Sequence, residues 1–325
     1  MEKPRKFSWT KYFSNEDYVS YIRKGTAFYN TTGSSNFYVF SCLFQKCTGN
    51  GAIYIQRDNK ICTLIESSVF SYCSSTSNSG TVYFVCPEGQ IVQERTCYYR
   101  SIGEGSLAFF QGVEPSPSAK NYLFEVSVYN CGENITTGII FFILWGELHI
   151  SNINSTNNKC SDIASLGSSL RGSPGKTNYS TFRENNQTVR SSFKVLSSSD
   201  LLTYTFSYCN IIGNSCGTDN NQVLFDCSGY INADNCIISN NTVVYMFYIE
   251  SPGIITISDS YIDAKSKDPG GYGDVTYTNL REDYDFNNFT HFYIKICFKE
   301  PKEITIRVSY LSKFAKAVSP SLLSS

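Results

Sequence analysis

A phrase of 25 to 29 residues recurs along most of this 325-residue chain and restricts it to a repeat architecture. In the stretch 36–55 (NFYVFSCLFQKCTGNGAIYI), an apolar residue stands three positions before a Cys. A polar turn with Gly then leads into an apolar run. Taking that apolar residue as the anchor of each copy gives nine anchors: Phe44, Phe70, Tyr99, Val128, Ile153, Phe182, Ile211, Ile237 and Ile262.

The residues three positions after the anchors change along the chain from mostly Cys to mostly Asn. They are Cys47, Cys73, Ile102, Cys131, Thr156, Asn185, Asn214, Asn240 and Lys265. Cys is a small and often buried residue. Asn tolerates left-handed turns, and its amide can hydrogen-bond the chains above and below it. We therefore expect Cys and Asn ladders at a turn.

Each copy contains up to three short apolar runs, which favours strands over helices. Its length is too short for a βαβ unit of about 30 or more residues, and for a propeller blade of about 40–45 residues. One coil of a parallel β-helix fits, with equivalent residues stacked about 4.8 Å apart. The 24 Tyr and 23 Phe also favour strands. The sequence predicts an all-β, single-stranded parallel β-helix of about nine or ten coils, with Phe70 and Phe182 buried inside.

The segments outside the repeat are expected to cover the open ends of such a solenoid. Residues 1–35 should form an N-terminal cap with a short helix, because Ser14 and Asp17 are placed like a capping box. Residues 36–285 form the solenoid, and 286–325 form a capping strand pair with a frayed tail. Within the solenoid, the Ser- and Gly-rich stretch Leu166 to Lys176 is typical of a loop.

Composition argues against several function classes. A net charge of −1 is unlike the basic face of a nucleic-acid-binding protein. No apolar run approaches the roughly 20 residues that span a bilayer, and no secretory signal or anchor is visible. No CxxC occurs, and His149 and His291 are the only histidines. We therefore expect no metal, no cofactor, no nucleic acid and no membrane span.

One pair of acids is a weak candidate for catalysis. Asp234 and Asp259 each lie three residues before an anchor, at equivalent positions of neighbouring coils. Two close carboxylates raise one pKa of the pair, and a retaining glycosidase needs carboxyl groups about 5–5.5 Å apart. The simpler interpretation, which we favour, is that both bond neighbouring backbone or solvent where the chain turns.

The phrases FQKC at 44–47, FSYC at 70–73, FREN at 182–185 and GAI at 51–53 resemble the FxxN and GGAI repeats of polymorphic outer-membrane proteins. Surface repeat proteins of parasitic protists contain similar phrases. The resemblance covers roughly residues 36–265. It implies a right-handed parallel β-helix similar to the pectin-lyase-like superfamily, displayed at the cell surface or outside the cell.

Two function classes remain open at this point. The first is a non-catalytic surface repeat protein that recognises a glycan or a protein along a strand face. The alternative is a pectin-lyase-like carbohydrate-processing enzyme, active or degenerate. Two acids and a base in one groove would favour the enzyme, whereas an exposed aromatic stripe without acids would favour recognition.

Overall fold

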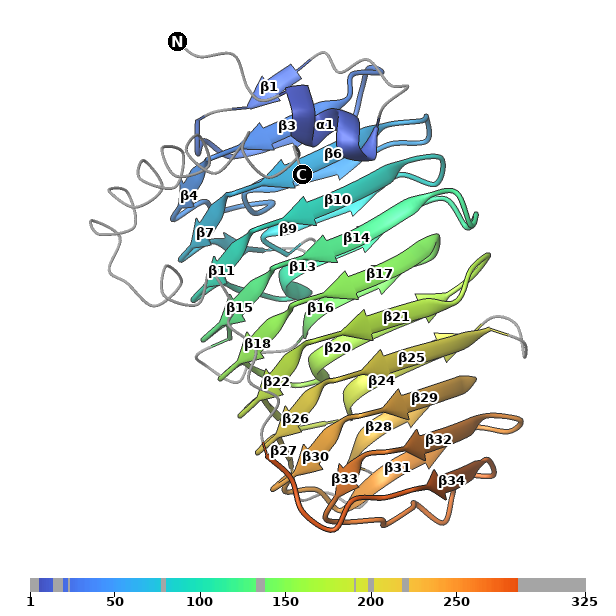
Figure 1. Ribbon diagram of the computed structural model, residues 1–325. Helices are drawn as coiled ribbons and strands as arrows, with labels where there is room; N and C mark the ends of the chain where they lie inside the picture. Colours follow the sequence, from blue (N-terminus) through green and yellow to red (C-terminus); the bar gives the residue numbers. More distant parts are fainter. Residues whose placement is uncertain are drawn as a thin grey trace, which may run out of the picture.

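The chain winds as a parallel β-solenoid with one short helix, α1 (Lys6–Tyr12), as Figure 1 shows. This computed structural model describes residues 6–13, 20–22, 24–76, 80–132, 138–189, 191–197, 202–217 and 222–285. Within those ranges, no helix is long and apolar enough to cross a membrane. The predicted all-β parallel β-helix is confirmed, with about eight turns in place of nine or ten.

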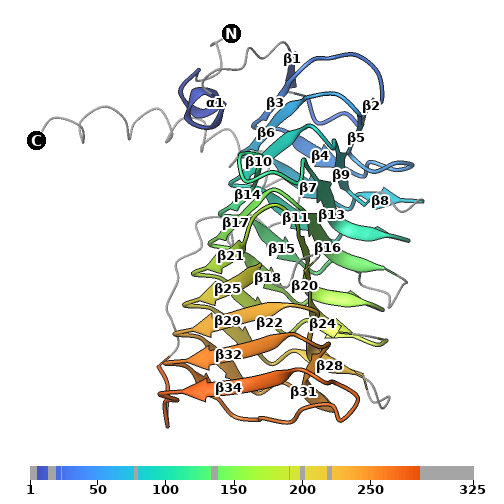
Figure 2. The same cartoon turned by 90° about the vertical axis from the view of Figure 1, so that its right-hand side faces the viewer.

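Three long parallel sheets form the walls of the solenoid, and each coil passes through them in the order A, C, B (Figure 2). Sheet A contains β1 (Ser20–Ile22), β3 (Phe37–Phe40), β6 (Cys62–Glu66), β10 (Gln90–Glu94), β14 (Lys120–Phe124), β17 (Glu147–Ser151), β21 (Gly175–Asn178), β25 (Thr203–Ser207), β29 (Tyr230–Asp234), β32 (Ile254–Ser258) and β34 (Asp274–Thr278).

Sheet C contains β4 (Leu43–Gln45), β7 (Val69–Ser71), β11 (Cys97–Tyr99), β15 (Ser127–Tyr129), β18 (Asn154–Thr156), β22 (Thr181–Arg183), β26 (Asn210–Ile212), β30 (Ile237–Ser239) and β33 (Tyr261–Ile262). Sheet B contains β2 (Phe28–Asn30), β5 (Ile53–Gln56), β9 (Val82–Val85), β13 (Ser106–Gly112), β16 (Ile139–Leu144), β20 (Ile163–Leu170), β24 (Ser191–Ser197), β28 (Val223–Cys227) and β31 (Tyr245–Ile249). Two small sheets between C and B pair β8 (Ser74–Ser75) with β12 (Ile102–Gly103), and β19 (Lys159–Cys160) with β23 (Asn186–Gln187) and β27 (Ser215–Cys216).

The anchor residues form one buried column in sheet C. The strand pairing gives the column Phe44, Phe70, Tyr98, Val128, Ser155, Phe182, Ile211, Ile238 and Ile262. Phe70 and Phe182 have no exposed surface, as predicted.

Three predicted anchors are wrong by one or two positions. Tyr99 and Ile237 lie next to the column members Tyr98 and Ile238, on the opposite face of their strands. Ile153 precedes β18 and is buried, but Ser155 occupies the column. A search for apolar residues misses Ser155 because that member of the column is polar.

Each coil bends at two positions that adopt left-handed backbone conformations. The first, between sheets A and C, has φ between 47° and 57°. It is occupied by Ser41, Ser67, Arg95, Glu125, Asn152, Tyr179, Tyr208, Asn235, Asp259 and Asn279. The second lies two residues after each column member and is occupied by Lys46, Tyr72, Arg100, Asn130, Asn157, Glu184, Gly213 and Asn240. Most of these residues are not glycine, so the stacking of coils offsets about 1–2 kcal/mol of strain at each.

The predicted ladder follows the second bend, with a corrected register. Carbonyl-to-amide bonds between coils align Cys47, Cys73, Ser101, Cys131, Asn158, Asn185, Asn214 and Asn241. Asn240 is not a member, because it occupies the left-handed position before Asn241 and is exposed. Ile102 and Thr156 are likewise displaced by one and two positions from the members Ser101 and Asn158.

The Asn side chains connect the coils in both directions. The Oδ1 of Asn185 accepts the backbone N–H of Asn158 at 3.0 Å, and the Oδ1 of Asn214 accepts that of Asn185 at 3.1 Å. Each Nδ2 donates to a carbonyl of the preceding coil, as in Asn185 to Ser155 at 3.0 Å. Because these groups are fully buried, the ladder satisfies backbone donors that the bend would otherwise leave unpaired.

Helix α1 packs against the outer face of sheet A. Trp9 lies on Tyr38 with ring centroids 6.1 Å apart, and the same cluster includes Phe13, Leu64 and Val92. The sheets themselves already begin with β1 and β2, so the regular solenoid starts before residue 36. The capping box at Ser14 and Asp17, and the strand pair predicted in 286–325, lie outside the described residues.

Candidate recognition surface

Five aromatic side chains form a continuous stripe on the outer face of sheet B. Strand pairing places Tyr29, Tyr54, Tyr83, Phe110 and Phe142 opposite one another in consecutive strands. Their ring centroids are separated by 4.9, 4.8, 5.5 and 6.0 Å, with interplanar angles of 13° to 18°. We call these five residues the aromatic stripe.

The alternation of each strand explains the stripe. In β5 and β9 the residues on either side of the tyrosine (Ile53, Ile55, Val82 and Phe84) are buried in the core, so that Tyr54 and Tyr83 point outward. Phe109 and Phe141 point inward and stack on each other at 4.8 Å, which leaves Phe110 and Phe142 on the outer face. Because consecutive strands of sheet B are evenly spaced, their outward rings then stack on one another.

The stripe ends at Gly167, which pairs with Phe142 in the next strand. A Cβ at this glycine would lie 2.2 Å from Cδ2 of Phe142, so the ring occupies the space above it. Beyond it, the same column carries Lys194 and Asp226, which form an ion pair at 3.1 Å. This column on the outer face of sheet B therefore changes from aromatic to charged after Gly167, and ends at Tyr248 in β31.

Burial within the stripe raises the pKa of two of its tyrosines. Desolvation raises the pKa of Tyr54, and the neighbouring Tyr29 raises it further. Desolvation and Tyr54 raise the pKa of Tyr83 in the same way. The Tyr54 hydroxyl donates a hydrogen bond to Oε1 of Gln56 at 2.5 Å. Because the rings stack, the stripe presents ring edges and hydroxyl groups along most of its length.

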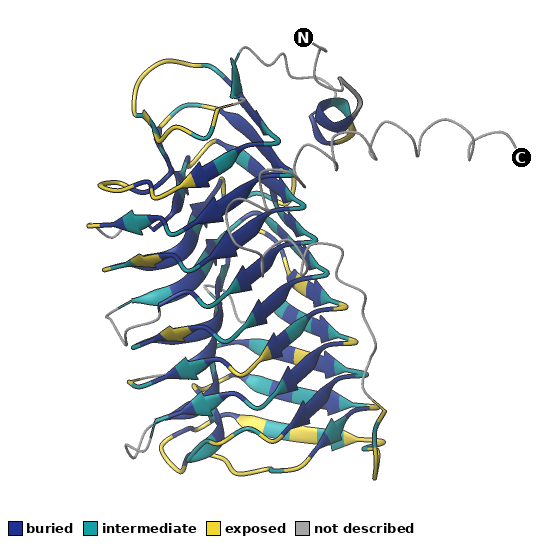
Figure 3. Ribbon diagram, turned by 90° about the vertical axis from the view of Figure 1, so that its left-hand side faces the viewer, coloured by how far each residue is buried: buried dark blue, intermediate teal, exposed yellow. Residues whose placement is uncertain are grey.

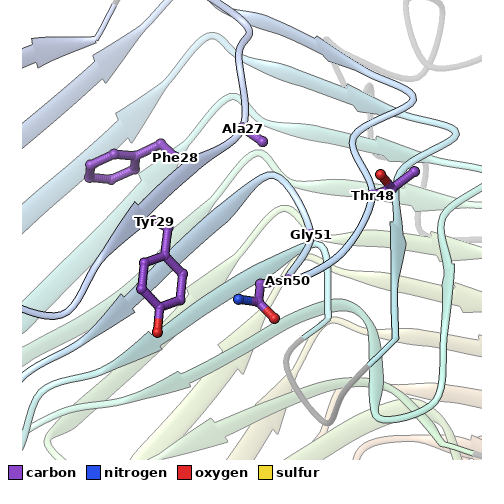
Figure 4. Close-up of a pocket in the computed structure, with 6 residues that line it drawn as sticks. All are labelled: Ala27, Phe28, Tyr29, Thr48, Asn50 and Gly51. Carbon is purple, nitrogen blue, oxygen red and sulfur yellow. The ribbon is translucent and has the colours of Figure 1, made fainter.

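A hollow of about 250 Å³ opens at the N-terminal end of the stripe, and we call it the Tyr29 hollow. Figure 4 shows the Tyr29 ring from β2 on one side and the Asn50 amide from the turn before β5 on the other. Its lining residues are Ala27, Phe28, Tyr29, Thr48, Asn50 and Gly51. None of the six is charged, and Tyr29 is 58% exposed.

The outer face of sheet A offers no comparable surface near α1. Glu66 is buried there and forms an ion pair with Arg95. It also accepts hydrogen bonds from the hydroxyls of Tyr38 and Ser8, the latter at 3.3 Å. At the edge of this contact, Lys11 and Tyr12 bond Glu94 at 3.3 and 3.1 Å. These charges fasten the helix to the sheet and are closed to a ligand.

The two acids of the weak candidate pair, Asp234 and Asp259, do not occupy equivalent positions of neighbouring coils. Asp234 pairs with Ser258 in the next coil, not with Asp259. Its carboxylate accepts hydrogen bonds from Ser258 at 3.1 Å and from Asn235 at 2.9 Å. Asp259 occupies the left-handed bend, in the column of Asn235. The anchor Ile237 caused this error, because the displaced register made the two acids look equivalent.

His149 lies on the outer face of sheet A among aromatic rings. It contacts Phe124 and Tyr122 edge-on, with centroids 4.9 and 5.6 Å apart. Burial lowers its pKa, and the nearby Lys176 lowers it further. His291 lies outside the described residues. In the part of the chain with assigned positions, no group of three or more His, Cys, Asp or Glu side chains can hold a metal ion.

Most cysteines that the structure describes are buried free thiols. They are Cys42, Cys47, Cys62, Cys73, Cys86, Cys131, Cys160, Cys209, Cys216, Cys227 and Cys236. Several donate to a carbonyl of the preceding coil, as Cys73 does to Phe44 at 3.7 Å. Cys97, on the outer face of sheet C, is disulfide-bonded.

The aromatic stripe was not predicted from the sequence, although the sequence contains a signal for it. The runs 53–55 (IYI), 82–84 (VYF) and 109–110 (FF) each place an aromatic residue at the position that alternates with the buried ones. Reading these runs in strand register, and not for apolar content alone, would have shown an aromatic outer face. No family model, curated protein or solved structure gives a significant match to this chain.

Proposed function

We propose that this chain is a non-catalytic β-solenoid repeat protein that recognises a glycan or a protein along the outer face of sheet B. The observation that supports this function most strongly is the aromatic stripe. Five in-register rings on a rigid sheet provide a preformed contact surface, and aromatic residues are enriched at recognition sites. Since strands fix the rings, little conformational entropy is lost on binding.

The arrangement of charged groups argues for recognition over catalysis. No member of the stripe is charged, and the acids Asp234 and Asp259 occupy different columns near the bend between sheets A and C. A glycosidase or lyase needs acids and a base gathered around one substrate bond. The pectin-lyase-like enzyme therefore has no observation in its favour, and we do not propose it.

We further propose display at the cell surface or outside the cell. The resemblance of the repeat phrases to outer-membrane-protein repeats motivates this location. The disulfide at Cys97 supports it, because disulfides persist in oxidising compartments. The buried free thiols are compatible with either compartment, since burial shields them from oxidants.

The proposal can be tested with a variant that removes the middle of the stripe. Tyr83→Thr combined with Phe110→Thr deletes two rings and places Thr, a β-branched residue that favours strands, at both positions. A matched control replaces Thr205→Ser and Asn232→Ser on the outer face of sheet A. Binding of each purified protein is measured on a printed glycan array and on an array of purified extracellular protein domains.

We expect the stripe variant to lose at least about tenfold in affinity for whatever the native chain binds, because central aromatic residues dominate such interfaces. The control should bind within about twofold of the native chain. Equal binding by the native chain and the stripe variant would contradict the proposed surface. Release of oligosaccharides from polygalacturonate or another polysaccharide would contradict the non-catalytic assignment.

A further inference from the structure

One part of the outer face of sheet C is buried, although the inner core lies on the other side of that sheet. Val69 and Cys97 are 1% and 0% exposed, and Tyr99 is 8% exposed. Phe70 and Tyr98, their neighbours in β7 and β11, stack inside the solenoid, so strand alternation turns these three side chains outward. We call Val69, Cys97 and Tyr99, which form a cluster separate from the inner core, the sheet C patch.

Burial is not a general property of these strand positions. In β4 the equivalent residues are Leu43, which is half-buried, and Gln45, which is exposed. In β22 they are Thr181, which is half-buried, and Arg183, which is exposed. The low exposure of the patch therefore indicates that other groups lie over this part of the sheet.

The disulfide at Cys97 identifies the segment that lies there. Cys97 is disulfide-bonded, and eleven of the 13 cysteines are free thiols, so Cys297 is the one cysteine that remains in the chain. A disulfide holds the Cα atoms of its two residues within about 7 Å of each other. Pairing within one chain therefore places the stretch around residue 297 on the patch.

The chain after β34 already lies on the same face. The backbone N–H of Arg281 donates to the carbonyl of Ser260, the residue before β33, at 2.9 Å. The ring of Tyr284 then lies 4.4 Å from that of Tyr261 in β33, and its hydroxyl accepts a hydrogen bond from Ser239 in β30 at 3.2 Å. Tyr284 therefore covers the outer face of sheet C at β33 and β30.

The chain that follows is long enough to reach the patch. Tyr261 and Cys97 belong to one row of sheet C and are six strand steps apart, which is about 29 Å. Cys297 follows Tyr284 by 13 residues, and an extended chain of that length spans up to about 43 Å. Residues 286–298 (FNNFTHFYIKICF) also contain four Phe and two Ile, which match the apolar patch in character.

We infer that the outer face of sheet C from β30 to β11 is a docking surface for residues 286–298 of this chain, which cross it as a strap fastened by a disulfide between Cys97 and Cys297. The bond forms when the two thiols give two electrons and two protons to an oxidising disulfide, which is thereby reduced to two thiols. The strap does not depend on the proposed recognition surface, which lies on sheet B.

Peptide mapping tests the bond. The full-length chain, produced under oxidising conditions, is alkylated, digested without reduction and analysed by mass spectrometry, beside a non-reducing gel. We expect the Cys97 peptide to be linked to the Cys297 peptide in a protein that runs as a monomer. Recovery of either cysteine as an alkylated thiol, or a dimer linked through Cys97, would overturn the strap.

Hydroxyl-radical footprinting tests the docking. Cys97→Lys and Cys297→Lys each remove the bond and place a charge on one side of an apolar contact, so that the strap leaves the face. The control Thr205→Lys places the same charge on the outer face of sheet A. Circular dichroism checks that the coils stay folded, and Cys297→Lys decides the test if Cys97→Lys disturbs β11, because position 297 follows the last coil in the sequence.

We expect the oxidation rate of Tyr99 to rise at least about threefold in both cysteine variants, because the covering segment has opened, and to stay at the native value in Thr205→Lys. Tyr272, which is 84% exposed, is the internal standard for radical dose. Equal oxidation of Tyr99 in the native chain and in a folded Cys297→Lys variant would show that residues 286–298 do not cover the patch, and would overturn the inference.

Discussion

At the scale of single residues, the buried Asn ladder pairs the backbone donors that follow the second bend of each coil. The second bend of each coil leaves the next backbone N–H facing the following coil. In the Asn part of the ladder, the side-chain Oδ1 of an Asn in that coil accepts this N–H. Where the ladder carries Cys, the thiol fills the same space and donates to a carbonyl. The change from Cys to Asn along the chain is therefore a change in which hydrogen bonds the ladder side chain makes after the second bend.

Removing one step of this ladder should destabilise the fold. Asn185→Ala leaves the buried N–H of Asn158 and the carbonyl of Ser155 without their partner, at a cost of about 2–4 kcal/mol. Urea unfolding followed by circular dichroism measures the change. Asn232→Ala is the control, because Asn232 is exposed on sheet A and lies outside the ladder. An equal midpoint for the two variants would show that the ladder bonds contribute little.

The ladder residue Cys47 and the core residue Cys209 should also differ in how their reactivity depends on pH. A hydrogen bond from Cys73 lowers the pKa of Cys47 to about 7, even though burial opposes this. Burial raises the pKa of Cys209 well above its ordinary value. A lowered pKa means that the Cys47 thiolate, which is the nucleophile, accumulates as pH rises through about 7.

Iodoacetamide labelling followed by mass spectrometry of peptides should therefore show the rate at Cys47 rising about tenfold from pH 6 to pH 8 and then levelling off by pH 9. Cys209 should stay unlabelled across this range until the protein is unfolded. Because Cys47 is only 8% exposed, its labelling rate should remain below that of a small free thiol. A labelling rate for Cys47 that still rises about fivefold between pH 8 and pH 9, as expected for a thiol of ordinary pKa, would contradict the lowered pKa.

At the scale of elements, α1 is an attachment to the solenoid and not part of its core. Its contacts are all with the outer face of sheet A, through Trp9, Tyr12 and Phe13. The buried ion pair of Glu66 with Arg95 sits beneath it, so the helix also shields a charge that sheet A alone would expose. The inner core of the solenoid forms a separate cluster.

Trp9→Ala should therefore release the helix without unfolding the coils. Trp9 is 1% exposed, and truncating such a residue removes about 3–5 kcal/mol of packing, which exceeds what a seven-residue helix gains by itself. Hydrogen exchange should show loss of protection in α1 with little change in β10. A variant in which β10 loses protection equally would show that the helix and the solenoid fold as one unit.

At this scale, most features of the fold were predicted from the sequence, whereas the exact strand register was not. The period, the parallel strands and the Cys and Asn ladder followed from spacing alone, because stacked coils must place like residues on like. The strand register could not be predicted to better than one or two residues, since Tyr98 and Tyr99 are both aromatic and Asn240 and Asn241 are the same residue type. Leu166 to Lys176 was expected to be a loop, yet β20 extends to Leu170. Gly167 leaves room for the Phe142 ring of the neighbouring coil, and the local sequence around Gly167 does not predict this contact.

The candidate site was harder to predict than the fold, because it depends on the exact register of the strands. Asp234 and Asp259 became a candidate pair through an anchor that was off by one residue. The aromatic stripe depends on five residues separated by 25 to 32 positions, which meet only when the coils are in correct register. Distant residues of this kind become a surface only in the assembled sheet.

At the scale of the whole molecule, stability should follow a nearest-neighbour pattern, because each coil contacts only the coils before and after it (Figure 3). Polar groups inside the solenoid reinforce this pattern across a coil. Gln93 of sheet A donates to Gln111 of sheet B at 2.9 Å, and Gln111 donates to Asn121 at 2.5 Å. Tyr98 of sheet C donates to Gln93 at 2.6 Å, so the three walls are joined within neighbouring coils.

Pairs of core substitutions distinguish a nearest-neighbour stack from a single cooperative core. Phe70→Ala and Phe182→Ala should each destabilise the protein by about 3–5 kcal/mol, since both side chains are fully buried. Phe44 and Phe70 stack at 4.9 Å, so replacing both should cost less than the sum of the single changes, because the contact between them is lost only once. Phe70 and Phe182 lie four steps apart in the same column and share no contact, which predicts that their effects on urea unfolding add to within about 0.5 kcal/mol. Strong coupling between Phe70 and Phe182, as large as that between Phe44 and Phe70, would mean that packing strain passes along the whole solenoid.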